Sequence, residues 1–287
     1  MERKKVLVSD AIRQGRARLL AAGVDSPWLD SEILLSEAMG WTREDLLAEN
    51  KQEIPHEVAP IWEGYLLRRE RREPIDRILG WRAFRHFRFR VVPGVFSPRP
   101  ETEELVQRAI PKVPDKGVVL DLCCAGGCVG ISLAYETEAR VVMVDCDNLA
   151  VQHAKEEVAR LIPEYGVKVL QSDLYNEVSG IFDVITANPP YIGEEEKESL
   201  PPEVALFDPP LALFAPDEPL SVAQCIVSDA PLHLREGGWL LMEVGFFLGE
   251  EALTLFGKGW SRARLRKPWG SPDHYPYLVV EAQWTGT

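Results

Sequence analysis

The chain has no long apolar run: no stretch of about 18 apolar residues occurs, so no membrane-spanning helix is expected. Its basic first residues are not followed by an apolar segment, so no secretory signal is expected either. Internal repeats and low-complexity tracts are also missing. The 287 residues, 46% hydrophobic and 27% charged, suit a globular enzyme with one full-sized domain and a smaller one.

Cysteine is scarce and irregularly spaced. There are five cysteines, an odd number, and Cys123 and Cys124 are adjacent. This pattern excludes a disulfide framework and predicts a cytoplasmic protein. No Cys-x-x-Cys pair occurs, so we interpret the group Cys123, Cys124, Cys128 and Cys146 as small packing residues and expect no metal.

An overall excess of positive charge is lacking as well. The net charge of −13 argues against a general nucleic-acid coat. Locally the balance is reversed, because ten arginines face only three acidic residues between Gly64 and Pro100. Two interpretations stay open: a solvated arginine-rich helix and hairpin, or a docking surface. The arginines are at positions 68, 69, 71, 72, 77, 82, 85, 88, 90 and 99.

Residues 1–80 have the pattern of short helices. Ser26 and Pro27 fit the start of a helix, Gly40 fits its end, and Thr42 fits the cap of the next one. A longer helix is expected over residues 56–72, with apolar positions on one stripe. Small helices joined by short loops predict a compact helical domain over 1–80.

Residues 81–98 change period. Phe84, Phe87, Phe89 and Val91 suggest strands, and Pro93-Gly94 suggests a turn. We interpret this segment as a hairpin that links two domains.

Residues 99–287 alternate between strand-like and helix-like segments. Such alternation predicts an α/β domain with a mostly parallel sheet and helices on both faces. The strand candidates are Val118–Leu122, Val141–Val144, Val167–Leu170, Val184–Ala187, Leu240–Val244, Ala263–Arg266 and Tyr277–Glu281. The helix candidates are Gly130–Ala134, Ala150–Leu161 and Leu220–Leu234. No helix is evident between the last two strands, which permits an antiparallel ending.

The loop after the first strand of this domain is rich in small residues. Cys123 to Gly130 reads Cys-Cys-Ala-Gly-Gly-Cys-Val-Gly, and small residues let backbone approach a ligand closely. About twenty residues further on, the second strand ends at Asp145, whose carboxylate can accept hydrogen bonds from ribose hydroxyls. The two features indicate a nucleoside-containing ligand. An imperfect dinucleotide fingerprint and an ordinary strand-to-helix turn are the alternatives.

A second motif follows the strand Phe182–Ala187, at the edge where ligands bind in such sheets. Asn188-Pro189-Pro190-Tyr191 carries two prolines, which fix φ and remove two backbone donors. Carbonyl oxygens and the Asn188 side chain then present acceptors to the N–H groups of a planar amide, and Tyr191 can stack on it. An amide nitrogen is a poor nucleophile, but orientation alone can contribute on the order of 7–11 kcal/mol. The motif therefore indicates methyl transfer to an amide-type nitrogen, with a plain Asn-Pro turn as the alternative.

These residues resemble the protein-(glutamine-N5) methyltransferases, the HemK-type enzymes that modify the Gly-Gly-Gln motif of peptide-chain release factors. Asn188–Ile192 matches the family signature fully, and the likeness extends over nearly the whole chain. The other matching segments are Glu73–Gly80, Ser97–Glu103 and Phe207–Leu213.

The resemblance implies a helical substrate-recognition domain followed by a seven-stranded class I, Rossmann-like methyltransferase domain that uses S-adenosyl-L-methionine. It implies that Asn188, Pro189, Pro190 and Tyr191 hold the glutamine, and that Leu174 lies near the adenine. The implied cofactor-binding set is Asp121, Cys123, Cys124, Ala125, Gly126, Gly127, Asp145, Asp173, Leu174 and Asn188.

Two departures from the family pattern leave the acceptor open. Cys124-Ala125 stands where the family loop has more alternating glycine, and Pro268–Asp273 lacks the arginine of an acidic-glycine-arginine stretch. A relative that methylates a small-molecule acceptor is therefore an alternative to a release-factor enzyme. An adenine N6-methyltransferase, an NAD oxidoreductase and an inactive binding module are further alternatives, although a nucleic-acid substrate would call for a more basic chain.

Overall fold

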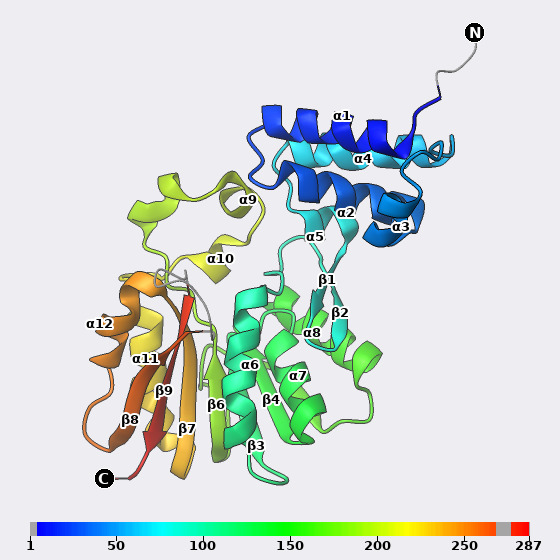
Figure 1. The fold of residues 1–287 in the computed structure, drawn as a ribbon. Coiled ribbons are helices and arrows are strands. Elements are labelled where there is room, and N and C mark those ends of the chain that lie inside the picture. Colours follow the sequence, from blue (N-terminus) through cyan, green and yellow to red (C-terminus); the bar gives the residue numbers. More distant parts are fainter. Residues whose placement is uncertain (1–4, 268–276, 287) are drawn as a thin grey trace. The chain divides into compact units, whose positions relative to one another are not determined.

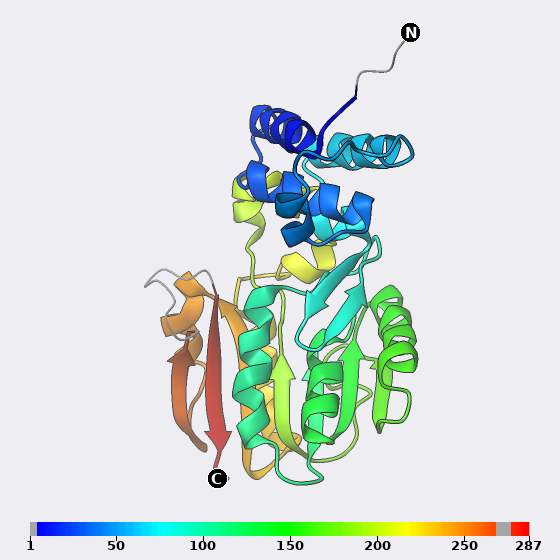
Figure 2. The ribbon, with the colours of Figure 1, turned by 45° about the vertical axis from the view of Figure 1, so that its right-hand side comes forward.

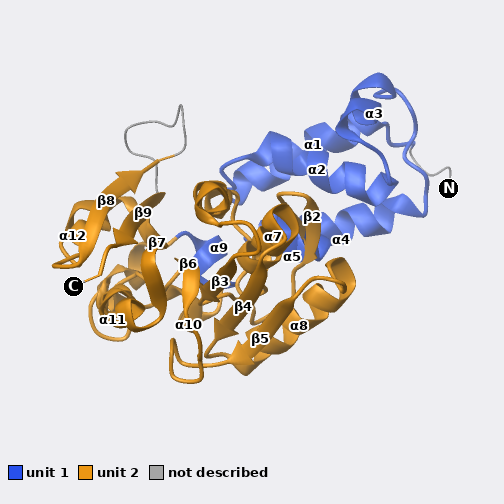
Figure 3. Cartoon of the chain, turned by 90° about the horizontal axis from the view of Figure 1, so that it is seen from below, with its two compact units in different colours: residues 1–81, 201–207 blue, residues 82–200, 208–287 orange. Residues whose placement is uncertain are grey.

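The computed structural model describes residues 5–267 and 277–286. The chain divides into two compact units (Figure 3): Met1–Trp81 with Pro201–Phe207, and Arg82–Leu200 with Asp208–Thr287. Within the described ranges, no helix is long and apolar enough to cross a membrane.

The first unit is helical, as the sequence predicted. Ser26 precedes α2, Pro27 is its first residue, and Gly40 ends it in the left-handed conformation at φ +66°, which favours glycine. Thr42 caps α3 by accepting a hydrogen bond from the backbone of Asp45, whose carboxylate binds the Thr42 N–H in return. The helix expected over 56–72 is Val58–Glu70. The helices are α1 (Val8–Ala21), α2 (Pro27–Met39), α3 (Arg43–Ala48), α4 (Val58–Glu70) and α5 (Ile75–Leu79).

A segment that interrupts the second unit in the sequence completes this unit. Pro201–Phe207, which contains the short helix α9 (Pro202–Ala205), belongs to the first unit although residues before and after it belong to the second. Glu203 of this segment accepts hydrogen bonds from Arg69 Nη2 at 3.0 Å and from Arg72 Nε at 2.7 Å. Arg69 is buried and also binds Asp30 Oδ2 at 2.7 Å. The arginines thus hold the segment in the unit by buried and half-buried ion pairs.

The hairpin consists of β1 (Trp81–Phe84) and β2 (Phe87–Arg90). Its two strands are joined at Arg85 and His86, and the turn expected at Pro93-Gly94 is present after β2. Arg85 adopts the left-handed backbone conformation, at φ +51°, although it is not a glycine. Tertiary contacts hold it there, because its N–H binds Glu103 at 3.0 Å and its Nε binds Glu136 at 2.8 Å.

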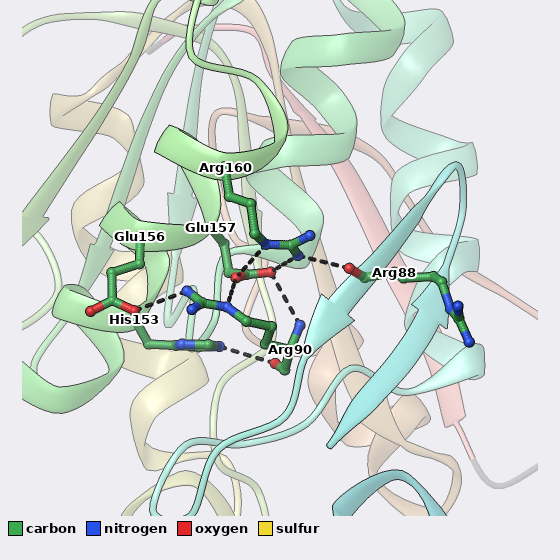
Figure 4. Close-up of polar contacts among 6 residues, drawn as sticks. All are labelled: Arg88, Arg90, His153, Glu156, Glu157 and Arg160. Atoms are coloured by element: carbon green, nitrogen blue, oxygen red, sulfur yellow. Dashed lines mark hydrogen bonds and ion pairs between the residues drawn. The ribbon is translucent and has the colours of Figure 1, made fainter. Parts of the chain in front are cut away.

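A polar network fixes β2 on α8 (Asn148–Leu161), as Figure 4 shows. The fully buried Glu157 accepts hydrogen bonds from Arg90 Nε at 2.6 Å and from Arg160 Nε at 3.1 Å. His153 Nε2 lies 3.1 Å from the Arg90 carbonyl oxygen. Arginines of the hairpin are therefore used to anchor it within the second unit.

In the described part of the second unit, seven strands form one sheet in the order β5-β4-β3-β6-β7-β9-β8. The first five are parallel, and β9 runs antiparallel to both β7 and β8, as the sequence permitted. The predicted α/β class with a mostly parallel sheet is confirmed. The strands are β3 (Val118–Leu122), β4 (Arg140–Asp145), β5 (Val167–Gln171), β6 (Phe182–Ala187), β7 (Leu234–Gly245), β8 (Trp260–Arg266) and β9 (Tyr277–Trp284).

Helices cover both faces of this sheet (Figures 1 and 2). Alternate residues of the strands pack against α6 (Glu103–Ala109), α7 (Cys128–Thr137) and α8 on one face. The other face packs against α11 (Ser221–Asp229) and α12 (Gly249–Leu253). The helix predicted over Leu220–Leu234 is shorter, because Pro231 follows its end and β7 already begins at Leu234. The remaining short helix, α10, spans Pro210–Leu213.

Candidate active site

A cavity lies at the carboxyl ends of the parallel strands, around the point where the strand order reverses between β3 and β6. This is where open α/β sheets bind ligands. The residues that follow four strands contribute to its wall: Cys123 and Ala125 after β3, Asp145 at the end of β4, Asp173 and Leu174 after β5, and Asn188 and Pro190 after β6. The structure therefore brings together seven of the residues selected from sequence.

The side chain of Asp145 is held in place by backbone N–H groups. Its Oδ2 accepts a hydrogen bond from the Ala125 N–H at 2.8 Å, and its Oδ1 accepts one from the Asp147 N–H at 2.9 Å. Burial raises the pKa of Asp145, while these two backbone donors oppose the rise. Each carboxylate oxygen has a second lone pair, so the side chain can still accept hydrogen bonds from two neighbouring hydroxyls in the cavity.

Asp121 lies beneath the cavity rather than in its wall. Its Oδ1 accepts a hydrogen bond from the Thr186 hydroxyl at 2.7 Å, and its Oδ2 accepts one from the Gly130 N–H at 3.0 Å. Burial raises its pKa to about 7. The carboxylate therefore ties β3 to β6 and to the start of α7, and the structure does not place it beside a ligand in the cavity.

The remaining residues of the loop after β3 also lie outside the cavity wall. Cys124 donates its N–H to the Val144 carbonyl at 3.0 Å, and Gly126 and Gly127 form the turn before α7. A side chain at Gly130 would meet the Met143 sulfur at 2.4 Å, so glycine there permits close packing of α7 on β4. These small residues therefore set the path of the loop without lining the cavity themselves.

The Asn-Pro-Pro-Tyr motif follows β6 directly. The Asn188 Nδ2 group donates to Glu243 Oε1 at 3.1 Å, and it lies 3.4 Å from the Thr102 hydroxyl oxygen. Asn188 and Pro190 line the cavity, whereas Pro189 and Tyr191 are outside its wall. Burial keeps the pKa of Tyr191 well above its usual value, and its ring lies edge-on to Tyr277 with centroids 6.4 Å apart.

Several parts of the cavity wall were not assigned from sequence. Among them are Phe96 and the segment from Pro209 to Phe214. An ion pair between Arg99 and the buried Asp208 joins the chain segments that carry them. The family-like segments Ser97–Glu103 and Phe207–Leu213 pointed to this region without giving it a role. Glu243 and Thr102, the partners of Asn188, were also missed, because neither motif contains them.

Cys123 and Cys124 have the buried surroundings expected of residues that serve in packing. Burial raises the pKa of Cys123 and Cys124 well above that of a free thiol, so both stay protonated. Among the described residues, no group of three or more His, Cys, Asp or Glu side chains is placed to hold a metal ion. Pro268–Asp273, the second departure from the family pattern, lies outside the described residues.

Comparisons with known proteins agree with this geometry. Residues 10–80 match the PrmC N-terminal domain family, and residues 86–258 match the methyltransferase small domain family. The release factor glutamine methyltransferase of Cereibacter sphaeroides is 37% identical over 86% of this chain and 88% of its own length. The enzyme of that name from Geobacter sulfurreducens is 34% identical over 85% of this chain and 86% of its own length.

Two solved structures share the fold. The Thermus thermophilus 16S rRNA N2 G1207 methyltransferase, in complex with AdoMet and guanosine, has a TM-score of 0.52 at 23% identity over 71% of this chain and 50% of that one. Methanocaldococcus jannaschii Trm5, in complex with adenosine, has a TM-score of 0.51 at 17% identity over 72% of this chain and 56% of that one. At these identities the likeness concerns the fold alone.

The mostly parallel seven-stranded sheet, its antiparallel ending and the cavity beside Asn188 define a class I methyltransferase domain, here accompanied by a helical unit. Within that class, the chain belongs to the release factor glutamine methyltransferase family. An NAD oxidoreductase is therefore excluded, and the relatives' names give no support to a small-molecule acceptor.

Proposed function

We propose that this chain transfers a methyl group from S-adenosyl-L-methionine to the side-chain amide nitrogen of the glutamine in the Gly-Gly-Gln motif of a peptide-chain release factor. One observation carries the proposal. Asn188, at the start of the Asn-Pro-Pro-Tyr motif, lines the same cavity as Asp145 and Leu174, so an amide and a nucleoside can occupy adjacent parts of it. Relatives named for this activity cover most of the chain.

The residues of the cavity suit the proposed cofactor. A carboxylate at Asp145 matches a ribose diol, and the apolar side chains of Leu174, Phe214 and Val222 match a flat purine base. When bound, S-adenosyl-L-methionine would supply an electrophilic methyl group. The wall residues Cys123, Ala125 and Asp173 would contact the rest of the cofactor. Cys124, Gly126 and Gly127 would set the path of the loop after β3. Asp121 would hold that loop in place through its backbone hydrogen bond.

The motif would orient the acceptor amide. Asn188 Oδ1 and the Pro189 carbonyl would accept the two N–H hydrogen bonds, Pro190 would fix the backbone, and Tyr191 would bound the glutamine side chain. Alignment of the nitrogen is the main contribution expected of these residues, because no strong base is needed when the methyl donor is a good electrophile. The proton that the nitrogen loses would pass to solvent.

The parts of the chain would divide the work. We propose that residues 1–80 recognise the protein substrate, residues 81–98 form the linking hairpin, and residues 99–287 carry out the transfer. The same assay tests the family activity and the open alternatives: purified chain, S-adenosyl-L-methionine, and either a release-factor domain or a panel of small amides and adenine-containing oligonucleotides. Methylation of the Gly-Gly-Gln glutamine alone is expected.

A further inference from the structure

Glu243 is a buried carboxyl group on β7, beside the strand that leads to the Asn-Pro-Pro-Tyr motif. Ala187 of β6 is paired with Met242 of β7, so the next residues, Asn188 and Glu243, lie next to each other at the edge of the sheet. Glu243 is only 3% exposed. It binds Asn188 Nδ2 at 3.1 Å but does not line the cavity itself.

The environment of this carboxyl group differs from that of the buried acids that have an arginine partner. Asp30 is paired with Arg69, Glu157 with Arg90, and Asp208 with Arg99. Glu243, in contrast, has no ion pair with any described residue, and no described group hydrogen-bonds its Oε2. A buried carboxylate without a cation is costly. Burial accordingly raises its pKa to about 7, although the Thr102 hydroxyl and the Asn188 amide favour the ionised form.

We infer that Glu243 is a positioning residue, which holds the Asn188 side chain by its Nδ2 end and thereby keeps Oδ1 available as the acceptor for the substrate amide. The inference rests on the proposed function. An asparagine amide has a donor end and an acceptor end of nearly equal shape. An acceptor fixed behind Nδ2 selects one of the two orientations, and no donor among the described residues competes for Oδ1.

The opposite orientation would present an NH₂ group to the NH₂ group of the substrate. Two donors facing each other leave both unpaired, and an unpaired buried polar group costs roughly 1–3 kcal/mol. Thr102 alone cannot fix the orientation, because a hydroxyl can donate or accept. Glu243 therefore acts on the reaction through Asn188, which explains why a carboxyl group without a cation is kept at this place.

Three variants separate this role from packing. Glu243→Met removes the acceptor at similar length, Glu243→Gln keeps an acceptor oxygen without the charge, and Leu241→Met changes an equally buried residue two positions away on the same strand. With a release-factor domain as substrate, we expect Glu243→Met to lower kcat at least about tenfold and Leu241→Met to stay within about threefold. Glu243→Gln should fall between them, because its amide can turn either an acceptor or a donor toward Asn188. The Kd for S-adenosyl-L-methionine should stay within about twofold in all three.

A double-mutant cycle adds the decisive readout. If Glu243 works through Asn188, then Glu243→Met should lower kcat by less than about twofold once Asn188→Ala is present. Independent, multiplicative losses would overturn the inference. So would an active wild-type chain whose Glu243→Met variant keeps its kcat. A wild-type chain that does not methylate the release-factor domain would instead overturn the proposed function, and with it this inference.

Thermal unfolding distinguishes positioning from structural support. Burial in the fold raises the pKa of Glu243 from the ordinary 4.5 to about 7, so the stability linked to its protonation is fully present below about 4.5 and is lost as pH rises through about 7. At pH 8 the folded chain carries the unfavourable charge. Glu243→Met should therefore keep or raise Tm at that pH while kcat falls. A joint fall of Tm, cofactor affinity and kcat would show that the residue is only structural.

Discussion

Cys123 and Ala125 take the left-handed backbone conformation in the loop that faces the cavity, at φ +55° and +46°. This conformation costs an L-residue on the order of 1–2 kcal/mol relative to glycine. This loop is therefore more strained than a loop with glycine at these positions would be. The hydrogen bond from the Ala125 N–H to Asp145 helps to hold the strained turn.

Replacing Ala125 by glycine should release part of this strain. Since glycine also loses more conformational entropy on folding, we expect Ala125→Gly to raise the free energy of unfolding by at most about 1 kcal/mol. Ala134→Gly, within the right-handed helix α7, is the matched control and should lower it by about 1 kcal/mol or more. Urea-induced unfolding of both variants measures the difference. Destabilisation by Ala125→Gly would contradict the strain at this position.

Asp145 is the residue on which the cofactor assignment depends most. Asp145→Ala removes the acceptors proposed for the ribose and leaves the Ala125 and Asp147 N–H groups without their partner. We expect at least about tenfold weaker binding of S-adenosyl-L-methionine, measured by calorimetry. Cys146→Ser, at the neighbouring position in the same wall, should change the affinity less than about twofold. Equal affinities of wild type and Asp145→Ala would show that Asp145 does not bind the cofactor.

Among the elements, strands were easier to predict than their surroundings. β3 begins and ends at the predicted residues, because a continuous apolar run between turn signals leaves little choice for a central strand. The hairpin turn at Arg85 carries no glycine or proline and depends on Glu103 and Glu136, which are distant in sequence. Likewise, the two motifs indicated Asp145 and Asn188, whereas Glu243 joins the site only through the pairing of β6 with β7.

The arginine-rich segment was also difficult to interpret from sequence, because several of its arginines have partners that are distant in the chain. Of the four arginines at the end of α4, Arg68 is paired with Glu73, Arg69 with Asp30 and Glu203, and Arg72 with Glu203. These ion pairs within the first unit reduce the positive charge that the three arginines can present, and a docking role for the segment stays a prediction. Arg71 is exposed and makes no ion pair with any described residue. A docking role for Arg71 stays a prediction.

Charge reversal at Arg69 and Arg71 should have different outcomes. Arg69→Glu would place a third carboxylate beside Asp30 and Glu203, and breaking such a buried pair costs roughly 3–5 kcal/mol. We expect the helical unit to lose its cooperative unfolding transition in circular dichroism. Arg71→Glu should change stability by no more than about 0.5 kcal/mol. Comparable stability of the two variants would show that the Asp30–Arg69–Glu203 network does not hold the unit together.

At the scale of the whole molecule, the chain passes between its two units more than once. After the Asn-Pro-Pro-Tyr motif it leaves the second unit at Leu200, contributes Pro201–Phe207 to the helical unit, and returns at Asp208 to form a wall of the cavity. The sequence pattern suggested a single crossing near residue 80. A crossing on each side of the segment 201–207 means that the helical unit is covalently linked to both the motif and the cavity wall.

Mass spectrometry can detect methyl transfer from S-adenosyl-L-methionine to a release factor. Wild-type chain and an Asn188→Ala variant would each be incubated with S-adenosyl-L-methionine and a purified release factor. We expect one added methyl group, located by fragmentation on the glutamine of Gly-Gly-Gln. Asn188→Ala should transfer it at least about a hundredfold more slowly, with cofactor affinity nearly unchanged. No transfer by the wild-type chain, transfer to another residue, or equal rates for both chains would contradict this expectation.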